Sequence, residues 1–349
     1  MITIQWSNLQ DLCVRLFIAA GLNEKEAVIV SQILIEAELD GVYTHGIAML
    51  PAHIRKLQVS YNAQAKVTIE CENTAFAVLN VNNMIGMLSA YYAMQLAIQK
   101  AQQSGIALIL CNHANTFSAA SYYVKMAVNA GMIGIAMSNA PAQMAPLNGK
   151  DKLLGTNPLA IGIPGKNEKP FIFDMATSVV AKSKINDAVR KCEKKIPYGW
   201  ATDLNGQPTN DPLTASKGLV LPAAGAKGFG LSMAIDMIAG VLSNANYLDD
   251  VGRFFPIENG CMNAGHAFIT INPDLLRTNC FANKIDEYLK RIRTSTQAGT
   301  DQIRVPGDAR RLKNKKSKNE GIFLDEQLMS EIKKISTELN VQYERFIEQ

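Results

Sequence analysis

The sequence predicts an α/β fold in which helical regions at both ends of the chain enclose a middle with a mixed sheet. Three observations lead to this prediction. Helical periodicity covers residues 7–40 and returns at 281–294 and 325–348. Between these regions lie short apolar runs typical of buried strands, at 106–110, 133–137 and 171–173. Strands and helices do not alternate strictly, and no G-x-G-x-x-G follows the first strand, which argues against a Rossmann dinucleotide fold.

Two amphipathic helices are predicted at the N-terminus. Ser7 can cap the first helix and Asn23 can cap the second, because their side-chain oxygens can accept a free backbone N–H. Glu26 stands three residues after Asn23, which gives a capping-box pattern. A third helix is expected to follow and to carry Met49 and His53.

The middle of the chain mixes both element types. Residues 66–80 alternate apolar and polar side chains, as a β-hairpin does. Residues 84–104 fit an amphipathic helix that ends at Ser104-Gly105. The remaining predicted elements are a helix at 118–130, a charged helix within 186–200, an apolar helix at 228–242, a strand at 265–271 and a basic loop around 304–308 between the last two helices.

Composition excludes several classes of protein. Of the 349 residues 48% are apolar and 19% charged, which predicts a globular chain of two or three domains. No long apolar run and no basic-then-apolar start occurs, so neither a membrane span nor a signal peptide is expected. Six scattered cysteines indicate reduced thiols in a cytoplasmic protein. The basic cluster at 310–318 lacks aromatic side chains and is interpreted as a solvated charge run, not as a nucleic-acid-binding patch.

Polar side chains come directly after several apolar runs, and groups at such sheet edges commonly contact ligands. They are Ser138, Asn139 and Asp174, together with Thr156 and Asn157 in a turn bracketed by Gly155 and Pro158. His113 lies just beyond the strand at 106–110, and an imidazole at a strand end is suited to general acid–base catalysis.

Seven motifs carry a family resemblance and occur in the same order over about residues 5–310. They are Thr44–Gly46, Phe117–Tyr123, Gly155–Ala160, Phe173–Ser178, Gly199–Ala201, Pro208–Pro212 and Leu221–Leu231. In them the chain resembles the malate/L-lactate dehydrogenase family, which lacks the Rossmann domain and includes ureidoglycolate dehydrogenase, sulfolactate dehydrogenase and diketogulonate reductase. The resemblance implies an NAD(P)-dependent oxidoreductase acting on a small 2-hydroxy acid or 2-oxo acid, of the ureidoglycolate, malate, lactate or sulfolactate kind. Reduction of a cyclic imine acid is a related possibility.

The resemblance also implies a layout of three domains and a homodimer. Residues 1–71 and 285–349 would form a helical terminal domain, 72–125 and 227–284 an α/β middle domain, and 126–226 a cofactor and substrate domain. The choice between NAD and NADP stays open, because a ribose-reading acidic residue cannot be located outside a Rossmann context.

Two histidines are candidates for the acid/base. His45 matches the position that has this role in diketogulonate reductase. Ureidoglycolate dehydrogenase uses a histidine at the position of Thr116, and His113, three residues earlier, could replace it. A metal-dependent hydrolase using both histidines is the rival interpretation, but neither H-E-x-x-H nor H-x-H spacing occurs, so no metal is expected.

Cofactor contacts are predicted around a glycine-rich helix start. Lys227 precedes an apolar helix, where a cation is unfavourable unless an anion such as a cofactor phosphate lies nearby. The residues that match cofactor contacts of the family are Ser138, Asp174, Met175, Ala176 and Lys227, with Gly307 and Asp308 in a later loop.

The chain departs from the family where the substrate is expected. Met49 replaces an arginine that can bind a substrate carboxylate in a fork, and His53 replaces a frequent aromatic residue. The predicted substrate contacts are Met49, His53, Thr116, Asn139 and Thr156. Substrate anchoring should therefore differ, and a non-catalytic homologue that kept the cofactor fold is a further alternative.

Overall fold

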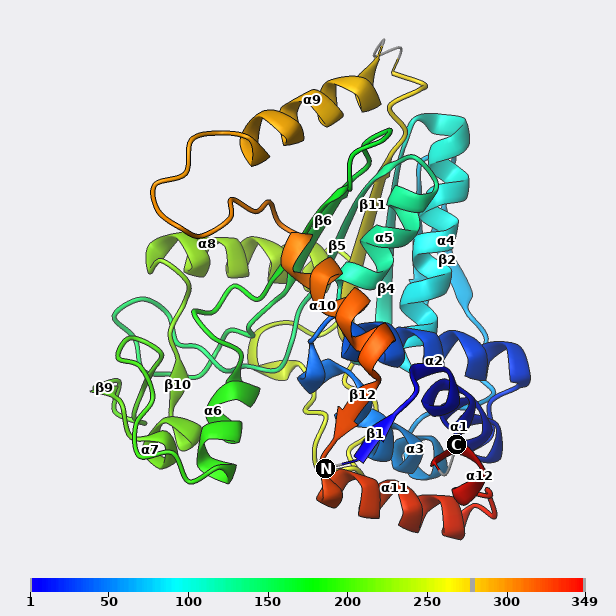
Figure 1. The fold of residues 1–349 in the computed structure, drawn as a ribbon, viewed down its shortest axis with the longest axis vertical. Helices are drawn as coiled ribbons and strands as arrows, with labels where there is room; N and C mark the ends of the chain where they lie inside the picture. Colours follow the sequence, from blue (N-terminus) through cyan, green and yellow to red (C-terminus); the bar gives the residue numbers. More distant parts are fainter. Residues whose placement is uncertain (1, 277–279, 348–349) are drawn as a thin grey trace.

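The computed structural model describes residues 2–276 and 280–347, and a mixed sheet of seven strands organises it (Figure 1). The strand order is β2-β3-β4-β11-β5-β6-β7, in which β3 and β4 are parallel and the other neighbours antiparallel. The strands are β2 Thr68–Glu72, β3 Phe76–Asn80, β4 Ile106–Ala114, β5 Ile133–Ser138, β6 Leu159–Ile163, β7 Phe171–Met175 and β11 Ala264–Ile271. The predicted α/β class with a mixed sheet is therefore confirmed. The predictions omitted strand β6, a five-residue run interrupted by Gly162.

Helices cover both faces of this sheet. Helices α4 (Gly86–Ser104) and α5 (Ser121–Asn129) lie on one face, while α8 (Ala226–Ile235) and a π-helix (Asp236–Val241) lie on the other (Figure 1). Successive strand residues point to opposite faces, so Ile109 joins the core under α4 and its neighbour Leu110 packs under the π-helix. Both faces are therefore apolar, as in a sheet that is covered on its two sides.

The two ends of the chain lie together. Strand β1 (Ile2–Ile4) pairs antiparallel with β12 (Ile322–Leu324), and both termini lie in the same region in Figure 1. The helices around this pair are α1 Trp6–Ala19, α2 Glu24–Leu39, α3 Leu50–Val59, α10 Asp308–Glu320, α11 Glu326–Glu338 and α12 Glu344–Ile347. The three-domain boundaries stay a prediction, and the seven-stranded sheet runs across the one at residue 126, because β5 pairs with β11.

Several predicted boundaries change. The Asn23–Glu26 capping box is confirmed, but α1 starts one residue before Ser7, with Gln5 as its N-cap. The segment around 308–320, expected to be a loop, is helix α10, whose lysines, arginines and asparagines give no apolar period to reveal it. The charged helix lies earlier than predicted, and the terminal helix is split in two. The remaining elements are α6 Lys182–Arg190, α7 Pro212–Lys217, α9 Phe281–Arg293, β8 Ala201–Thr202, β9 Pro208–Thr209 and β10 Leu219–Val220.

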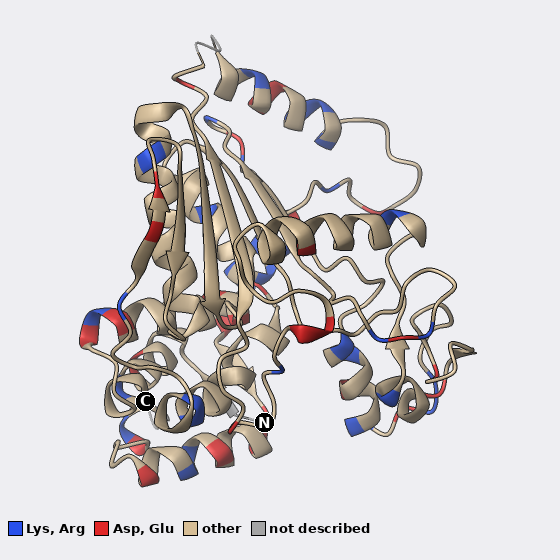
Figure 2. Cartoon of the chain, turned by 180° about the vertical axis from the view of Figure 1, so that it is seen from behind, with Lys and Arg blue, Asp and Glu red and all other residues tan. Residues whose placement is uncertain are grey.

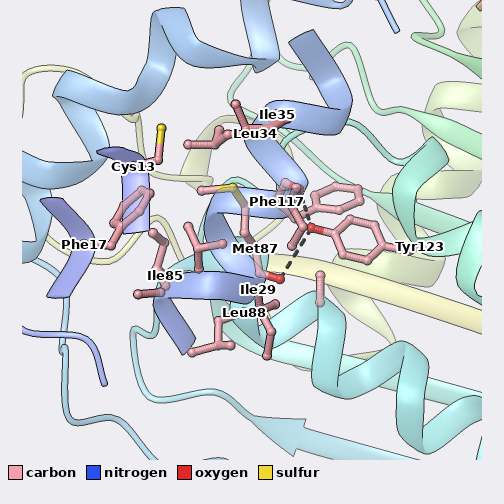
Figure 3. Close-up of a cluster of buried hydrophobic side chains, with 14 of the residues drawn as sticks. Cys13, Phe17, Ile29, Leu34, Ile35, Ile85, Met87, Leu88, Phe117 and Tyr123 are labelled. Carbon is pink, nitrogen blue, oxygen red and sulfur yellow. Dashed lines mark hydrogen bonds between the residues drawn. The ribbon is translucent and has the colours of Figure 1, made fainter. Parts of the chain in front are cut away.

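A buried cluster connects the terminal helices to the sheet (Figure 3). Cys13 and Phe17 of α1 contribute to this cluster, together with residues of α2 and α4. Phe117 and Tyr123 belong to the same core, and the Tyr123 hydroxyl donates to the Phe117 carbonyl at 2.5 Å. This contact fixes the segment at residues 116–118, which leads into the site. Among the described residues, no helix is both long and apolar enough to cross a bilayer.

Candidate functional site

His45 lies on an irregular segment between α2 and α3. Two short 3₁₀ turns, Tyr43–His45 and Ile47–Met49, meet at Gly46. A Cβ atom at Gly46 would lie 2.4 Å from a Glu38 carboxylate oxygen, so a side chain there would displace that carboxylate. The same carboxylate accepts the Ile47 N–H at 3.0 Å. The predicted third helix is present as α3 and carries His53, but it begins at Leu50, so Met49 is its N-cap and not part of it.

The second wall of the site is the segment after strand β4. The Ser118 hydroxyl donates to the His45 carbonyl at 2.6 Å, and Ser118 itself has a left-handed φ of 67°. The Asn115 side chain donates to Asn83 Oδ1 at 2.9 Å and accepts the Met262 N–H at 3.1 Å. These bonds hold the segment between the His45 turns and the loop before β11.

Two cavities adjoin His45 and share six lining residues. The Met49 cavity, of about 190 Å³, is lined by Thr44, His45, Met49, His53, Thr116, Ser118, Pro141, Phe254, Phe255 and Met262. The Thr156 cavity, of about 300 Å³, shares Thr44, His45, Thr116, Ser118, Pro141 and Met262 and adds residues that include Ser138, Asn139, Thr156, Ala176, Lys182 and Ser183. A larger cavity of about 640 Å³ lies between the 145–151 loop and the strands β8–β10, and no histidine lines it.

The structure brings together all five residues predicted to contact substrate. Met49, His53 and Thr116 line the Met49 cavity, and Thr116, Asn139 and Thr156 line the Thr156 cavity. Asn139 has no free hydrogen-bonding group, since its amide donates to Asp236 and to the Asn246 carbonyl and its Oδ1 accepts the Gly265 N–H. Asn139 therefore shapes the cavity rather than presenting a group to a ligand.

The environment of His45 favours a neutral imidazole. Burial lowers the pKa of His45, the Asp174 carboxylate opposes that shift, and the Arg310 guanidinium adds to it. Its Nδ1 lies 3.0 Å from the Thr44 hydroxyl oxygen, which can fix the tautomer. A neutral imidazole facing two cavities can accept a proton.

His113 lies apart from both cavities. It is exposed, with a φ of 51°, and its Nδ1 lies 2.9 Å from Asn112 Oδ1. Strand β4 ends at Ala114, and Thr116, two residues beyond it, lines both cavities, whereas His113 lines neither. Within the described residues, no group of three or more His, Cys, Asp or Glu side chains is arranged to hold a metal ion.

Five of the predicted cofactor contacts, Ser138, Asp174, Met175, Ala176 and Lys227, are referred to as a strip that begins at the Thr156 cavity. Ser138 and Ala176 line that cavity, and Asp174 and Met175 end strand β7 beside it. The segment after β7 contacts the glycine-rich loop before α8, because the Ala223 N–H donates to the Thr177 carbonyl at 2.9 Å. A Cβ atom at Gly228 would lie 2.6 Å from the same carbonyl.

The groups along this strip fit an anionic dinucleotide. Lys227 is exposed in the first turn of α8, and its backbone N–H and that of Gly228 already donate to the carbonyls of Ala224 and Ala223, so its ammonium is the group that can meet an anion. Glycines 225 and 230 leave open space in which a ligand can approach the backbone. Asp174 is not free: it accepts from the Ser121 N–H at 3.1 Å and pairs with Arg310 at 2.8 Å. The carboxylate is thus neutralised by the protein and does not repel a phosphate.

Gly307 and Asp308 occupy the start of α10, outside both cavities. The Asp308 carboxylate accepts from Arg293, Arg311 and the Val305 N–H, and these contacts lower the pKa of Asp308 although its burial opposes the shift. The carboxylate therefore fixes the 304–308 loop and has little capacity left for a ribose hydroxyl.

The sequence did not predict two basic side chains at the site, Lys182 and Arg310. Lys182 lines the Thr156 cavity, and its Nζ donates to the carbonyls of Ala215 and Gly218 at 2.8 Å each. Burial and the nearby Lys152 lower the pKa of Lys182 to about 8. Arg310, grouped in sequence with a solvated basic run, holds Asp174. No local signal separates Lys182 from Lys184, which is exposed, because only the fold determines which one enters the cavity.

Fold and site together define a class of protein: an α/β chain without a Rossmann unit, with an imidazole between two cavities and an anion-compatible strip beside one of them. A family model described as malate/L-lactate dehydrogenase matches residues 4–333. Malate/(S)-sulfolactate dehydrogenase from Methanothermus fervidus is 37% identical over 335 residues, which are 95% of this chain and 97% of that one. Ureidoglycolate dehydrogenase (NAD(+)) from Escherichia coli is 33% identical over 306 residues, 87% of each chain. The solved structure of sulfolactate dehydrogenase from Methanocaldococcus jannaschii matches with a TM-score of 0.93 and 36% identity, over 99% of this chain and 100% of that one.

The chain therefore belongs to the malate/L-lactate dehydrogenase family. The predicted family, its non-Rossmann α/β fold and the assignment to the oxidoreductases are confirmed at this level. The names of its relatives include both NAD(+) and NADP(+) as cofactors, in agreement with the two possibilities left open by the sequence.

Proposed function

We propose that the protein is an NAD(P)-dependent dehydrogenase that interconverts a small 2-hydroxy acid and its 2-oxo acid, with His45 as acid/base. One observation carries the proposal: the half-buried imidazole of His45 stands where a cavity lined by cofactor motifs meets a second cavity of substrate size. The other candidate, His113, lines neither cavity.

In this proposal the residues of the chain hold the reactants and move one proton. The nicotinamide, when bound, accepts or supplies the hydride. Ser138, Asp174, Met175, Ala176 and Lys227 would hold the cofactor. His45 takes the hydroxyl proton during oxidation and returns it during reduction, and its lowered pKa suits a base that must be neutral before the reaction. The predicted Gly307 and Asp308 contacts remain part of the proposal as a loop that borders the cofactor.

A carboxylate anchor is needed because Met49 stands at the position of the arginine fork. Lys182 is the only lysine or arginine among the described residues that line either cavity. Two of its three ammonium hydrogens have carbonyl partners, so the third can bind a carboxylate. We therefore assign Lys182 to substrate binding ahead of Arg55 and Lys184, which line neither cavity.

We also propose a cytoplasmic homodimer. None of the six cysteines forms a disulfide, which is consistent with a reducing compartment. Helix α8, the π-helix and the residue after it present four apolar side chains that are 40–58% exposed, namely Met233, Met237, Val241 and Leu242. Figure 2 shows α8 and the π-helix as one continuous helix that crosses the back of the sheet and has few charged residues. A second copy can cover such a face about a two-fold axis without like-charge repulsion. Sedimentation should give a dimer, and Met237→Glu a monomer.

A panel of 2-oxo acids, assayed with NADH and with NADPH by nicotinamide absorbance, tests the reaction. Turnover of at least one 2-oxo acid supports the proposal. Reduction of cyclic imine acids alone would mean that the protein is an imine acid reductase. Cofactor binding without turnover of any substrate would mean that it is a non-catalytic homologue.

A further inference from the structure

The Met49 cavity contains an apolar wall and no ionic side chain. Met49, Phe254, Phe255, Met262 and Pro141 line it, and none of its lining residues is a lysine, arginine, aspartate or glutamate. Its volume of about 190 Å³ corresponds to on the order of six water molecules at about 30 Å³ each. A branched aliphatic or phenyl group fits in this space, since an apolar cavity of about 150 Å³ can bind benzene.

His53 adds surface to the cavity but no positive charge. Its side chain is buried, and its ring lies edge-on to Phe254 with the ring centres 5.3 Å apart. Burial and the neighbouring Lys56 lower the pKa of His53 to about 3, so the imidazole is neutral at physiological pH. While His45 and His53 are neutral, a carboxylate or sulfonate in this cavity would have no cationic partner among the lining residues.

Lys56 fixes the aromatic wall instead of binding a ligand. The residue is fully buried, and its ammonium donates to the carbonyls of Ile257 at 3.2 Å and Asn259 at 3.0 Å and to the Ser60 hydroxyl at 3.4 Å. These bonds use its three hydrogens, and its Nζ also lies 5.2 Å from the centre of the Phe254 ring. The loop around residues 252–262 is thereby held on helix α3 as a wall.

We propose that the Met49 cavity binds the substrate side chain and selects 2-hydroxy acids with an uncharged, apolar side chain over those with a second carboxylate or a sulfonate. This inference rests on the proposed function, because it takes the reacting carbon to lie at His45. The physical reason is desolvation: an anion moved into an apolar cavity loses its hydration and finds no counterion, whereas an apolar group gains from leaving water.

Two unreactive 2-oxo acid analogues test the preference without turnover. N-isobutyl oxamate and N-oxalylglycine share the oxamate end and differ in an apolar or a carboxylate side group. Isothermal titration of the protein loaded with the cofactor it binds should give at least tenfold tighter binding of N-isobutyl oxamate. Equal affinity, tighter binding of N-oxalylglycine, or binding of neither would overturn the inference.

A charged variant and a matched control locate the effect. Phe255→Lys places a cation at the cavity and should shift the affinity ratio at least tenfold towards N-oxalylglycine. Phe323→Lys is the control, because Phe255 and Phe323 are equally exposed, at 56%, and Phe323 lies on strand β12, away from the cavity. A shift of the same size in both variants would overturn the inference. If the analogues bind as expected but no 2-oxo acid is reduced, the proposed reaction fails while the binding preference stands.

Discussion

The two cavities beside His45 differ in how they relate to the rest of the family. Three residues of the Thr156 cavity, Thr156, Pro158 and Ala176, lie in the motifs Gly155–Ala160 and Phe173–Ser178. Asn157, between Thr156 and Pro158, accepts the Ala140 N–H and donates to the Ser232 carbonyl. The Met49 cavity contains the three departures, Met49, His53 and Thr116. Under the proposed function, this difference predicts that cofactor binding and hydride transfer are kept while substrate selection has changed.

The largest expected effect concerns the residue common to both cavities. His45→Ala should lower turnover by about two to four orders of magnitude and leave cofactor affinity nearly intact, because the acid/base is lost and the strip beside the Thr156 cavity is not. In the wild type, reduction needs protonated His45 and should fall as pH rises through a pKa below 6.5, whereas oxidation should rise. Single-turnover kinetics across pH measure both. His113→Ala is the control, and a loss of turnover there with His45→Ala active would reverse the assignment.

The second-largest expected effect concerns Glu38, whose carboxylate accepts the Ile47 N–H next to the turn that carries His45. Burial raises the pKa of Glu38 from an ordinary 4.5 to about 7. The unfolded chain then releases this proton at lower pH than the native protein, so the group's contribution to stability is present below pH 4.5 and is lost as pH rises towards 7. The increase in the pKa of Glu38 from 4.5 to about 7 corresponds to at most about 3 kcal/mol of unfolding free energy.

Glu38→Gln should therefore stabilise the protein at pH 8 but not at pH 4.5, while an amide oxygen can still accept the Ile47 N–H. Urea unfolding at the two pH values measures the difference. Glu331→Gln on the exposed face of α11 is the control. An unchanged pH dependence in Glu38→Gln would show that this carboxyl does not titrate as described.

The sequence predicted some features of the fold and of the two cavities and not others. Motif order and apolar periodicity predicted the class, most elements and the residues around His45, because these are local signals. Other features depend on contacts between segments far apart in the chain. They are the central position of β11 in the sheet, the ion pair of Arg310 with Asp174 and the position of Lys182 at a cavity. The loop carrying Phe254 and Phe255 was likewise not predicted, since nothing in its sequence links it to Lys56, about 200 residues earlier.

A third, smaller effect tests the cofactor strip alone. Lys227→Ala should weaken binding of the nicotinamide dinucleotide by about 1–3 kcal/mol, the scale of a lost charge-assisted hydrogen bond. Isothermal titration with NADH and NADPH measures the loss, and Lys334→Ala, at an exposed site on α11, is the control. Unchanged affinity in Lys227→Ala would mean that the lysine is only a surface residue.

The smallest expected effect concerns Met49, which replaces an arginine that can bind a carboxylate. Met49 and His45 lie on separate 3₁₀ turns but line the same cavity, so an arginine at this position can reach a ligand beside His45. Met49→Arg should lower the Michaelis constant for oxaloacetate by roughly tenfold, about 1.4 kcal/mol, because a guanidinium can hold the second carboxylate in a fork. Met49→Leu keeps the cavity apolar and should leave that constant nearly unchanged.

Pyruvate separates the two roles that the new guanidinium could take. If Lys182 already anchors the first carboxylate, Met49→Arg improves oxaloacetate but not pyruvate, which has no second carboxylate. If the first carboxylate has no anchor in the native protein, the variant improves both substrates equally, and Lys182→Met should then leave their Michaelis constants unaltered. A fall in activity on both substrates would mean that the arginine only crowds the cavity, and the division between a conserved cofactor side and an altered substrate side would lose its support.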